Sequence, residues 1–168
     1  MTHPIVLGLF DTPAAGAAAA RALRDLGIPR ERVSIVARNH DVEGELASAS
    51  GGSPGSEIED SRVASGLAEL GAHLIAAIAV VLPGIGPIVA GGPLAAGMGE
   101  AAGHLAGGLS RTLQDAGMPE ADADAWTAQI ERGAVLIAAH ASAATAAATR
   151  TALETAGASK VTEGTWHE

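Results

Sequence analysis

The sequence predicts an α+β fold in which two β-α-β halves form one four-stranded antiparallel sheet. An apolar strand pattern opens the chain, and the same strand–helix pattern returns near the C-terminus after a long intervening segment. Matching positions, such as Thr12 and Ser142 or Gly27 and Gly157, are 130 residues apart. A repeat at one fixed offset indicates two copies of a supersecondary unit. Two such halves, with the second and third strands distant in sequence, are typical of the ferredoxin-like fold, which carries its two helices on one face.

The first half begins with the apolar run Ile5 to Phe10, which predicts a buried strand. Thr12 is expected to cap the following helix, and Pro13 suits its first position because the N–H that proline lacks has no helical partner there. The helix is expected to end at Gly27. Residues 32–38 then alternate between polar and apolar side chains, as a second strand does.

The second half repeats this order after a short helix expected from Glu120 to Arg132. Residues 134–139 form an apolar strand pattern, Ser142 is expected to cap a helix, and residues 160–166 are expected to form the last strand. The predicted organisation is a first half at 1–39, a flexible acidic linker at 40–60, an inserted helical hairpin at 61–117, and the completing half at 118–168.

The inserted hairpin is predicted from an uncharged run, Leu74 to Met98, that is interrupted by prolines and glycines. We expect its turn at Pro83, Gly84, Gly86 and Pro87. Small residues flank this turn at four-residue spacing, which on helices gives ridges without side-chain bulk that allow close helix contacts. The predicted self-association residues are Ala64, Ala68, Ala72 and Ala76 before the turn and Gly91, Ala95, Gly99, Gly103 and Gly107 after it.

Composition points to an assembled rather than a monomeric protein. Apolar residues make up 48% of the chain but aromatic residues only 2%, so the core relies on small aliphatic side chains that bury little area each. Oligomerisation commonly compensates for such a core. The net charge of −9 argues against binding to nucleic acid or docking on anionic lipid. The chain has no cysteine, and its first residues lack a signal-peptide pattern, so we expect a cytoplasmic protein.

Several strings in the sequence resemble a known family. VLGLFDT, RALRDLGI, RVSIVAR, VLPGIGPIVAGGPLAAG and ERGAVLIAAH together resemble the bacterial general-stress-protein family that includes the heat-induced YflT-type domain. The first three strings resemble that domain itself, and the last two are similar to longer relatives with a helical insertion. The resemblance spans most of the chain apart from the acidic linker. It implies a stress-associated protein without enzymatic activity.

No residue pattern in the chain indicates catalytic chemistry, a metal or a cofactor. The six histidines lack the spacing of metal ligands and are expected to be core or rim residues. Glu120, Asp122 and Asp124 follow Pro119, where negative charge at a helix start is favourable, so we prefer that role to a cation site. The glycine-rich stretch 84–92 lacks a phosphate-binding motif, and no nucleophile elbow is present. The sequence therefore predicts a protein that is not an enzyme, with no small-molecule substrate identified.

Three functional hypotheses remain open at this stage. The first is a homo-oligomer assembled through the helical hairpin, and the second is a membrane-associated protein whose hairpin tip inserts into the bilayer. The apolar arm from Leu74 to Leu82 would be only about 13 Å long as a helix, well short of a hydrocarbon core of about 30 Å. The third is a small-ligand or metal-sensing module that uses the sheet face opposite the helices.

Overall fold

The computed structural model describes residues 2–38, 77–82, 86–94 and 108–167. Its strands are β1 (Thr2–Phe10), β2 (Val33–Arg38), β3 (Ala77–Leu82), β4 (Gly86–Gly91), β5 (Val135–His140) and β6 (Lys160–His167). Its helices are α1 (Pro13–Asp25), α5 (Gly108–Asp115), α6 (Glu120–Glu131) and α7 (Ala146–Thr155), with a short 3-10 helix η1 (Arg30–Arg32) before β2.

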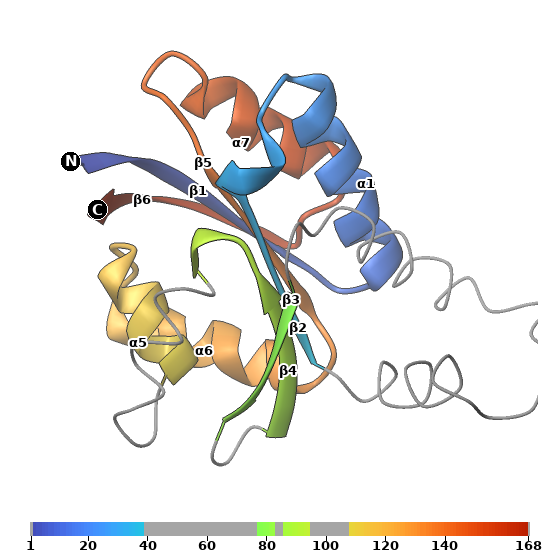
Figure 1. The fold of residues 1–168 in the computed structure, drawn as a ribbon, viewed down its shortest axis with the longest axis vertical. Coiled ribbons are helices and arrows are strands. Elements are labelled where there is room, and N and C mark those ends of the chain that lie inside the picture. Colours follow the sequence, from blue (N-terminus) through green and yellow to red (C-terminus); the bar gives the residue numbers. More distant parts are fainter. Residues whose placement is uncertain (1, 39–76, 83–85, 95–107, 168) are drawn as a thin grey trace, which may run out of the picture.

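The strands form one antiparallel sheet in the order β3-β4-β2-β5-β1-β6 (Figure 1). Four neighbouring strands of this sheet, β2-β5-β1-β6, come from the two sequence halves. This confirms the predicted four-stranded antiparallel sheet. The two termini lie side by side in β1 and β6, which pair from Thr2 opposite His167 to Leu9 opposite Lys160.

The first helix begins and ends as the sequence predicts. The Thr12 hydroxyl oxygen accepts a hydrogen bond from the Ala15 N–H at 3.3 Å, and Pro13 occupies the first turn. At the other end Gly27 adopts a φ of 78°, a left-handed conformation that closes a helix at little cost for glycine.

The end of α7 repeats the end of α1 with the predicted offset. Gly157 has a φ of 94°, and the N–H of Ala158 donates to the Leu153 carbonyl at 3.1 Å. The start of α7 differs slightly from the prediction, because Thr145 rather than Ser142 holds the cap position. Ser142 instead shapes the preceding turn, since its hydroxyl oxygen accepts from the Thr145 N–H at 3.2 Å.

The prediction of helix for the apolar inserted run is wrong over residues 77–91. There the chain forms β3 and β4, which pair antiparallel from Ala77 opposite Gly91 to Leu82 opposite Gly86. The two elements that flank the predicted turn are therefore antiparallel strands instead of helices, and residues 83–85 between them lie outside the described part of the chain. Among the described residues β2 pairs with β4 from Ile88 to Gly91, so none of these pairs requires the N–H that Pro87 lacks.

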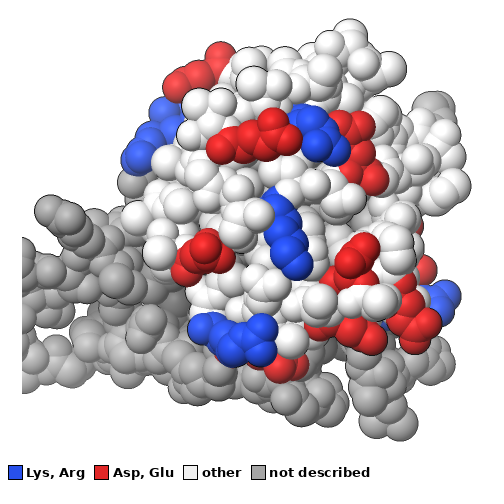
Figure 2. Space-filling view, turned by 180° about the vertical axis from the view of Figure 1, so that it is seen from behind, with Lys and Arg blue, Asp and Glu red and all other residues white. Residues whose placement is uncertain are grey.

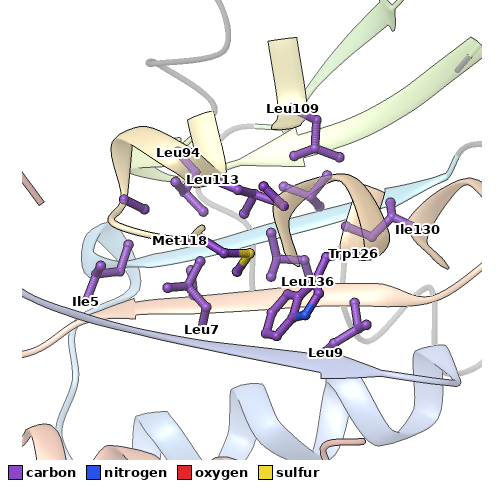
Figure 3. Packing of buried hydrophobic residues seen from close by; sticks show 14 of the residues in the cluster. Ile5, Leu7, Leu9, Leu94, Leu109, Leu113, Met118, Trp126, Ile130 and Leu136 are labelled. Atoms are coloured by element: carbon purple, nitrogen blue, oxygen red, sulfur yellow. The ribbon is translucent and has the colours of Figure 1, made fainter. Parts of the chain in front are cut away.

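The helices of the two halves, α1 and α7, lie on one face of the sheet, as the sequence predicted, and α5 and α6 cover the other face. One hydrophobic cluster lies between the sheet and the pair α1 and α7, and contains Phe10, Leu23 and Leu153. The other lies between the sheet and the pair α5 and α6. Figure 3 shows Trp126 reaching from α6 toward Leu9 and Leu136 in this second cluster. The face that the ligand-sensing hypothesis needed open is therefore covered by α5 and α6.

Close packing of the α5–α6 layer on the edge strand depends on Gly164. A Cβ placed on this residue of β6 would overlap the carbonyl oxygen of Ala116, just after α5. A glycine at this strand position therefore allows the backbone of the helical layer to touch the backbone of the sheet.

Candidate functional site

Most of the predicted self-association residues lie outside the described part of the chain. Gly91 is the exception among them, and it ends β4, opposite Ile35 of β2 and Ala77 of β3. It therefore lies in the middle of a sheet and not on a helical ridge, which corrects its predicted role. Gly86 and Pro87 begin β4. The residues outside the described ranges are Ala64, Ala68, Ala72, Ala76, Pro83, Gly84, Ala95, Gly99, Gly103 and Gly107.

The structure instead shows small-residue stripes at four-residue spacing on α1 and α7. Ala18, Ala22 and Leu26 follow one another on α1 and its C-terminal cap, and they line a shallow groove between the two helices. Each has a counterpart 130 residues later on the opposite wall. The lining residues from α7 and its C-cap are Ala147, Ala148, Thr151, Ala152, Thr155 and Ala156.

This α1–α7 groove has a volume of about 600 Å³ and is mostly apolar, with Thr151 and Thr155 as its polar lining residues. The Thr151 hydroxyl donates to the Ala147 carbonyl oxygen at 3.1 Å, so its hydrogen is used within the helix. Leu26 stands at one end of the groove with 45% of its surface exposed, and among the described residues it is the large hydrophobic side chain left in water. The groove thus combines one exposed leucine with walls made largely of alanine.

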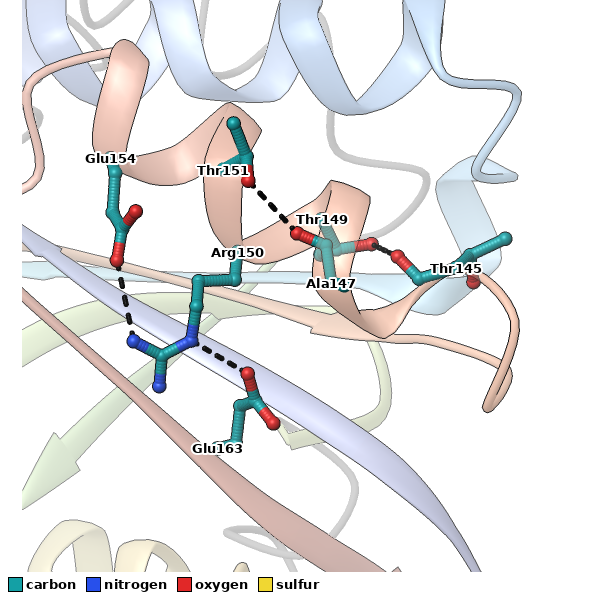
Figure 4. Close-up of polar contacts among 7 residues, drawn as sticks. All are labelled: Thr145, Ala147, Thr149, Arg150, Thr151, Glu154 and Glu163. Carbon is teal, nitrogen blue, oxygen red and sulfur yellow. Dashed lines mark hydrogen bonds and ion pairs between the residues drawn. The ribbon is translucent and has the colours of Figure 1, made fainter.

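Polar contacts on the other side of α7 fix this helix to the edge of the sheet (Figure 4). The Arg150 guanidinium donates to Glu163 of β6 at 2.6 Å and to Glu154 of α7 at 3.3 Å. The hydrogen bond to Glu163, followed by the charges of Glu163 and Glu154, raises the pKa of Arg150. The ion pair lies at the surface, so it orients α7 more than it stabilises the fold.

A second group of side chains lies at the end of the sheet where the termini meet. Nε2 of His3 on β1 is 2.6 Å from Nδ1 of His140 on β5, a hydrogen-bond distance. The ring of Trp166 on β6 meets the His140 ring edge-on, with centroids 5.3 Å apart and planes at 84°. Strand alternation places all three rings on the face covered by α5 and α6. We refer to His3, His140 and Trp166 as the terminal ring cluster.

His140 is the most perturbed titratable residue of the described chain. It is 3% exposed, and its Nε2 has no hydrogen-bond partner among the described residues. Burial, then the neighbouring charges of His3 and Arg32, lowers the pKa of His140 from 6.5 to about 4. His140 is therefore a neutral imidazole at pH 7, as expected for a buried base without an anionic partner.

The acidic residues at the start of α6 stabilise α6 and its contact with α5. Glu120 and Asp122 lie in the first turn, where they oppose the helix dipole, as predicted. Asp124 accepts a hydrogen bond from the Ser110 hydroxyl at 2.6 Å and so ties α6 to α5. Within the described ranges no three His, Cys, Asp or Glu side chains converge as metal ligands.

A smaller hollow of about 290 Å³ lies beside the start of β6. Trp126 and Met118 form its apolar part, and Asp122 and Lys160 face it from opposite elements. Both charged side chains are exposed to water. They therefore gain little by pairing with a ligand in this hollow, since solvent screens exposed charges.

Charges of both signs are interspersed on the face of the molecule shown in Figure 2. Basic side chains on this face are separated by acidic and neutral ones, so they do not form a continuous track for a phosphate backbone. Among the helices that the structure describes, none has the length and apolar character needed to cross a bilayer.

Sequence reasoning found the strands that carry the terminal ring cluster but missed the contact between its histidines. Antiparallel pairing of β1 with β5 places Ile5 opposite His140, and His3 lies one side-chain step away on the same face. The contact between the two rings could have been predicted if this register had been known from the sequence. The α1–α7 groove was also missed, although alanines recur on every side of α1. Comparison with protein families, curated proteins and solved structures finds no match to this chain.

Proposed function

We propose that this chain is a non-enzymatic, self-associating protein that assembles through the α1–α7 groove. A second copy of the same chain is the proposed occupant. The observation that carries the proposal is the groove itself: an apolar surface with an exposed Leu26 and a shallow, alanine-lined depression. A two-fold contact needs a surface that complements itself, and this surface offers both an exposed leucine and a depression to receive it.

The internal repeat supports a two-fold arrangement. The three residues of the α1 wall, Ala18, Ala22 and Leu26, have equivalents 130 positions later in the α7 wall, and of these pairs only Leu26 and Ala156 differ in residue type. A two-fold mate would place its Leu26 against the alanines of α7 and receive Leu26 of the first copy in return. Alanine-lined helices permit the close approach that such packing needs.

The proposed fold type, family and lack of enzymatic activity rest on the sequence. We propose that the four-stranded core is ferredoxin-like and that the chain is related to the bacterial general-stress family that its strings resemble. The non-enzymatic part rests on the lack of cysteine, of a nucleophile elbow and of a phosphate-binding motif in the whole sequence. A cytoplasmic location is part of the same proposal.

The hypothesis of a membrane-inserted hairpin tip assumed helical arms, and this assumption is wrong for residues 77–82 and 86–91. Residues 77–82 and 86–91 are strands that pair with one another, and β4 also pairs with β2. Liposome flotation of the full-length protein would separate the two hypotheses, since a discrete oligomer that stays behind when the liposomes float supports assembly over insertion.

The test of the groove is the native mass of full-length variants by light scattering. Ala148 is exposed on the α7 wall, so Ala148→Glu should place a charge in the contact without disturbing the core and reduce the assembly to single chains. Ala125→Glu, on the exposed side of α6, is the matched control and should leave the mass unchanged. An unchanged mass for Ala148→Glu would refute the proposal.

Gly103→Leu distinguishes the groove from the inserted segment as the association element. Assembly through the predicted small-residue ridge would be lost in this variant, because the leucine side chain would prevent the close helix contact that glycine allows. Assembly through the α1–α7 groove should survive it. Loss of assembly in Gly103→Leu together with an intact Ala148→Glu oligomer would move the interface to the insertion.

A further inference from the structure

The terminal ring cluster joins three strands at the end of the sheet that holds both chain termini. His3 belongs to β1, His140 to β5 and Trp166 to β6, and His3 is directly opposite Trp166 in the β1–β6 ladder. The hydrogen bond from the Ala141 N–H to the Pro4 carbonyl at 2.9 Å closes the β1–β5 ladder beside them. Any repulsion between these rings therefore acts first on the start of β1 and on the end of β6.

The cluster has no described counter-charge for a second proton. The charged groups that act on His140 from the elements around it are His3 on β1 and Arg32 at the end of η1, and both oppose a positive charge. On the face of β6 that meets the cluster, Thr162, Gly164 and Trp166 carry no charge, and Lys160 at the far end of the strand is a cation. On α5, the exposed Asp115 pairs with Arg111 at 3.2 Å. The hydrogen bond between the histidines needs one N–H and one lone pair, so it persists with one shared proton but not when both rings are fully protonated.

We propose that the contact between His3 and His140 is an acid-sensitive clasp that holds the terminal strands on the sheet. At neutral pH the His140 ring is neutral, shares one hydrogen bond with His3 as either donor or acceptor, and packs against Trp166. Acidification places charge on a buried ring beside His3 and Arg32, and the clasp opens because water can reach the charge only if the rings separate. The end of β6 and the start of β1 then detach, while β2, β4 and the centre of β5 remain paired.

Trp166 and Trp126 provide separate probes of this local opening. They are the two tryptophans of the chain. Trp166 packs against the edge of the cluster that contains Trp126, but Trp126 lies beside residues 160–162 at the start of β6, the opposite end of this strand from Trp166. The experiment is an NMR titration of the full-length protein from pH 7 to pH 3.5 that follows both indole N–H signals and the His140 ring signals. The clasp predicts that Trp166 shifts together with His140, and that Trp126 changes only at lower pH.

Hydrogen exchange measures the size of the effect. The amides at the end of β6 should show an opening constant that rises roughly twentyfold between pH 7 and pH 5, because His140 resists protonation in the closed state but not in the open one. Amides of β2 in the same samples should show no such rise.

Two variants separate the clasp from general acid sensitivity. His140→Phe keeps a flat ring but cannot take a proton, so the pH dependence of exchange at β6 should disappear. His167→Gln is the matched control, because His167 is exposed on β6 and lies on the opposite face of the strand from Trp166; its pH dependence should equal that of the natural chain.

Three outcomes would overturn the proposal. The first is a simultaneous change of Trp166 and Trp126, which would mean global unfolding. The second is an unchanged Trp166 signal down to pH 3.5, and the third is an undiminished pH dependence in His140→Phe. Since the order of the two tryptophan transitions is measured in the natural chain, the test holds even where the His140 variant does not fold.

Discussion

The two helical layers of this protein solve the packing problem in opposite ways. The α5–α6 layer covers the sheet with large side chains, including Trp126, Met118 and Leu113. The α1–α7 layer covers it mainly with alanines, and alanines also line its outer groove. Bulk in the first layer is used up inside the fold, whereas the second layer leaves an apolar surface that remains available for a partner. The comparison teaches that one layer buries its large side chains in the core, whereas the other leaves apolar surface exposed, and the proposed assembly uses this second layer.

The largest predicted effect belongs to the bulky layer. Trp126→Ala should lower the free energy of unfolding by about 3–5 kcal/mol, because it removes a nearly buried indole and leaves a cavity. Leu26→Ala in the other layer should change stability by less than about 1 kcal/mol, since that side chain is 45% exposed, yet weaken association. Urea denaturation of both variants checks the contrast, and equal losses would break it.

Acidification is expected to act on the bulky layer through His140. The folded state holds this ring neutral with a pKa of about 4, while the unfolded chain protonates near 6.5. The stabilising effect is therefore complete above pH 6.5 and is lost as the pH falls to 4, by about 3 kcal/mol in total. Denaturation midpoints measured across this range should show the loss in the natural chain and a much smaller one in His140→Phe. A flat profile in the natural chain would contradict the assignment.

Thr127→Val should stabilise the protein. Thr127 is buried on α6, and its hydroxyl oxygen has no hydrogen-bond partner among the described residues. Replacing the hydroxyl with a methyl group of similar size removes that cost, so we expect a gain of about 1 kcal/mol in the free energy of unfolding. Thr149→Val is the control that should lose stability, because the Thr149 hydroxyl donates to the Thr145 carbonyl oxygen at 2.8 Å.

The smallest predicted effect concerns the polar edge of the alanine layer. Glu163→Gln removes the charge that Arg150 contacts from β6. Because this pair is exposed, the thermal midpoint should fall only slightly at low salt and match the natural chain at high salt. A large loss that persists in high salt would mean that α7 depends on the ion pair instead of on Leu153 and its neighbours.

Sequence reasoning predicted the elements that carry local signals. Thr12, Pro13 and Gly27 specify α1 by cap chemistry alone, and Gly157 repeats the signal for α7. The strands of the two halves follow from short apolar runs bounded by turns. These signals depend only on neighbouring residues, so no tertiary knowledge was needed.

The error over residues 77–91 has a physical cause. A short apolar run bounded by turn residues fits a buried strand or a buried helix equally well by periodicity. The four-residue spacing of flanking alanines and glycines favoured helix. The β-branched residues Ile78, Val80 and Val81 favoured strand, and the sheet edge offered by β2 decided the outcome.

The groove and the terminal ring cluster could not be predicted for a different reason. Both join residues more than 100 positions apart, through helix packing in one case and strand register in the other. The stripe Ala18, Ala22 and Leu26 has the same four-residue spacing as the stripes predicted in the insertion, but the sequence analysis did not single it out. Choosing between two such stripes requires knowing which helix face the sheet covers.

The most direct test of the central claim is the distance between equivalent points of two copies. Because the chain lacks cysteine, single variants Arg24→Cys on α1 and Ala125→Cys on α6 each accept one spin label per copy. Pulsed electron resonance on the full-length protein should give a short interlabel distance for α1 and a much longer one for α6, because the sheet separates α6 from the groove. A shorter distance for α6, or no dipolar coupling at either position, would contradict assembly through the α1–α7 groove.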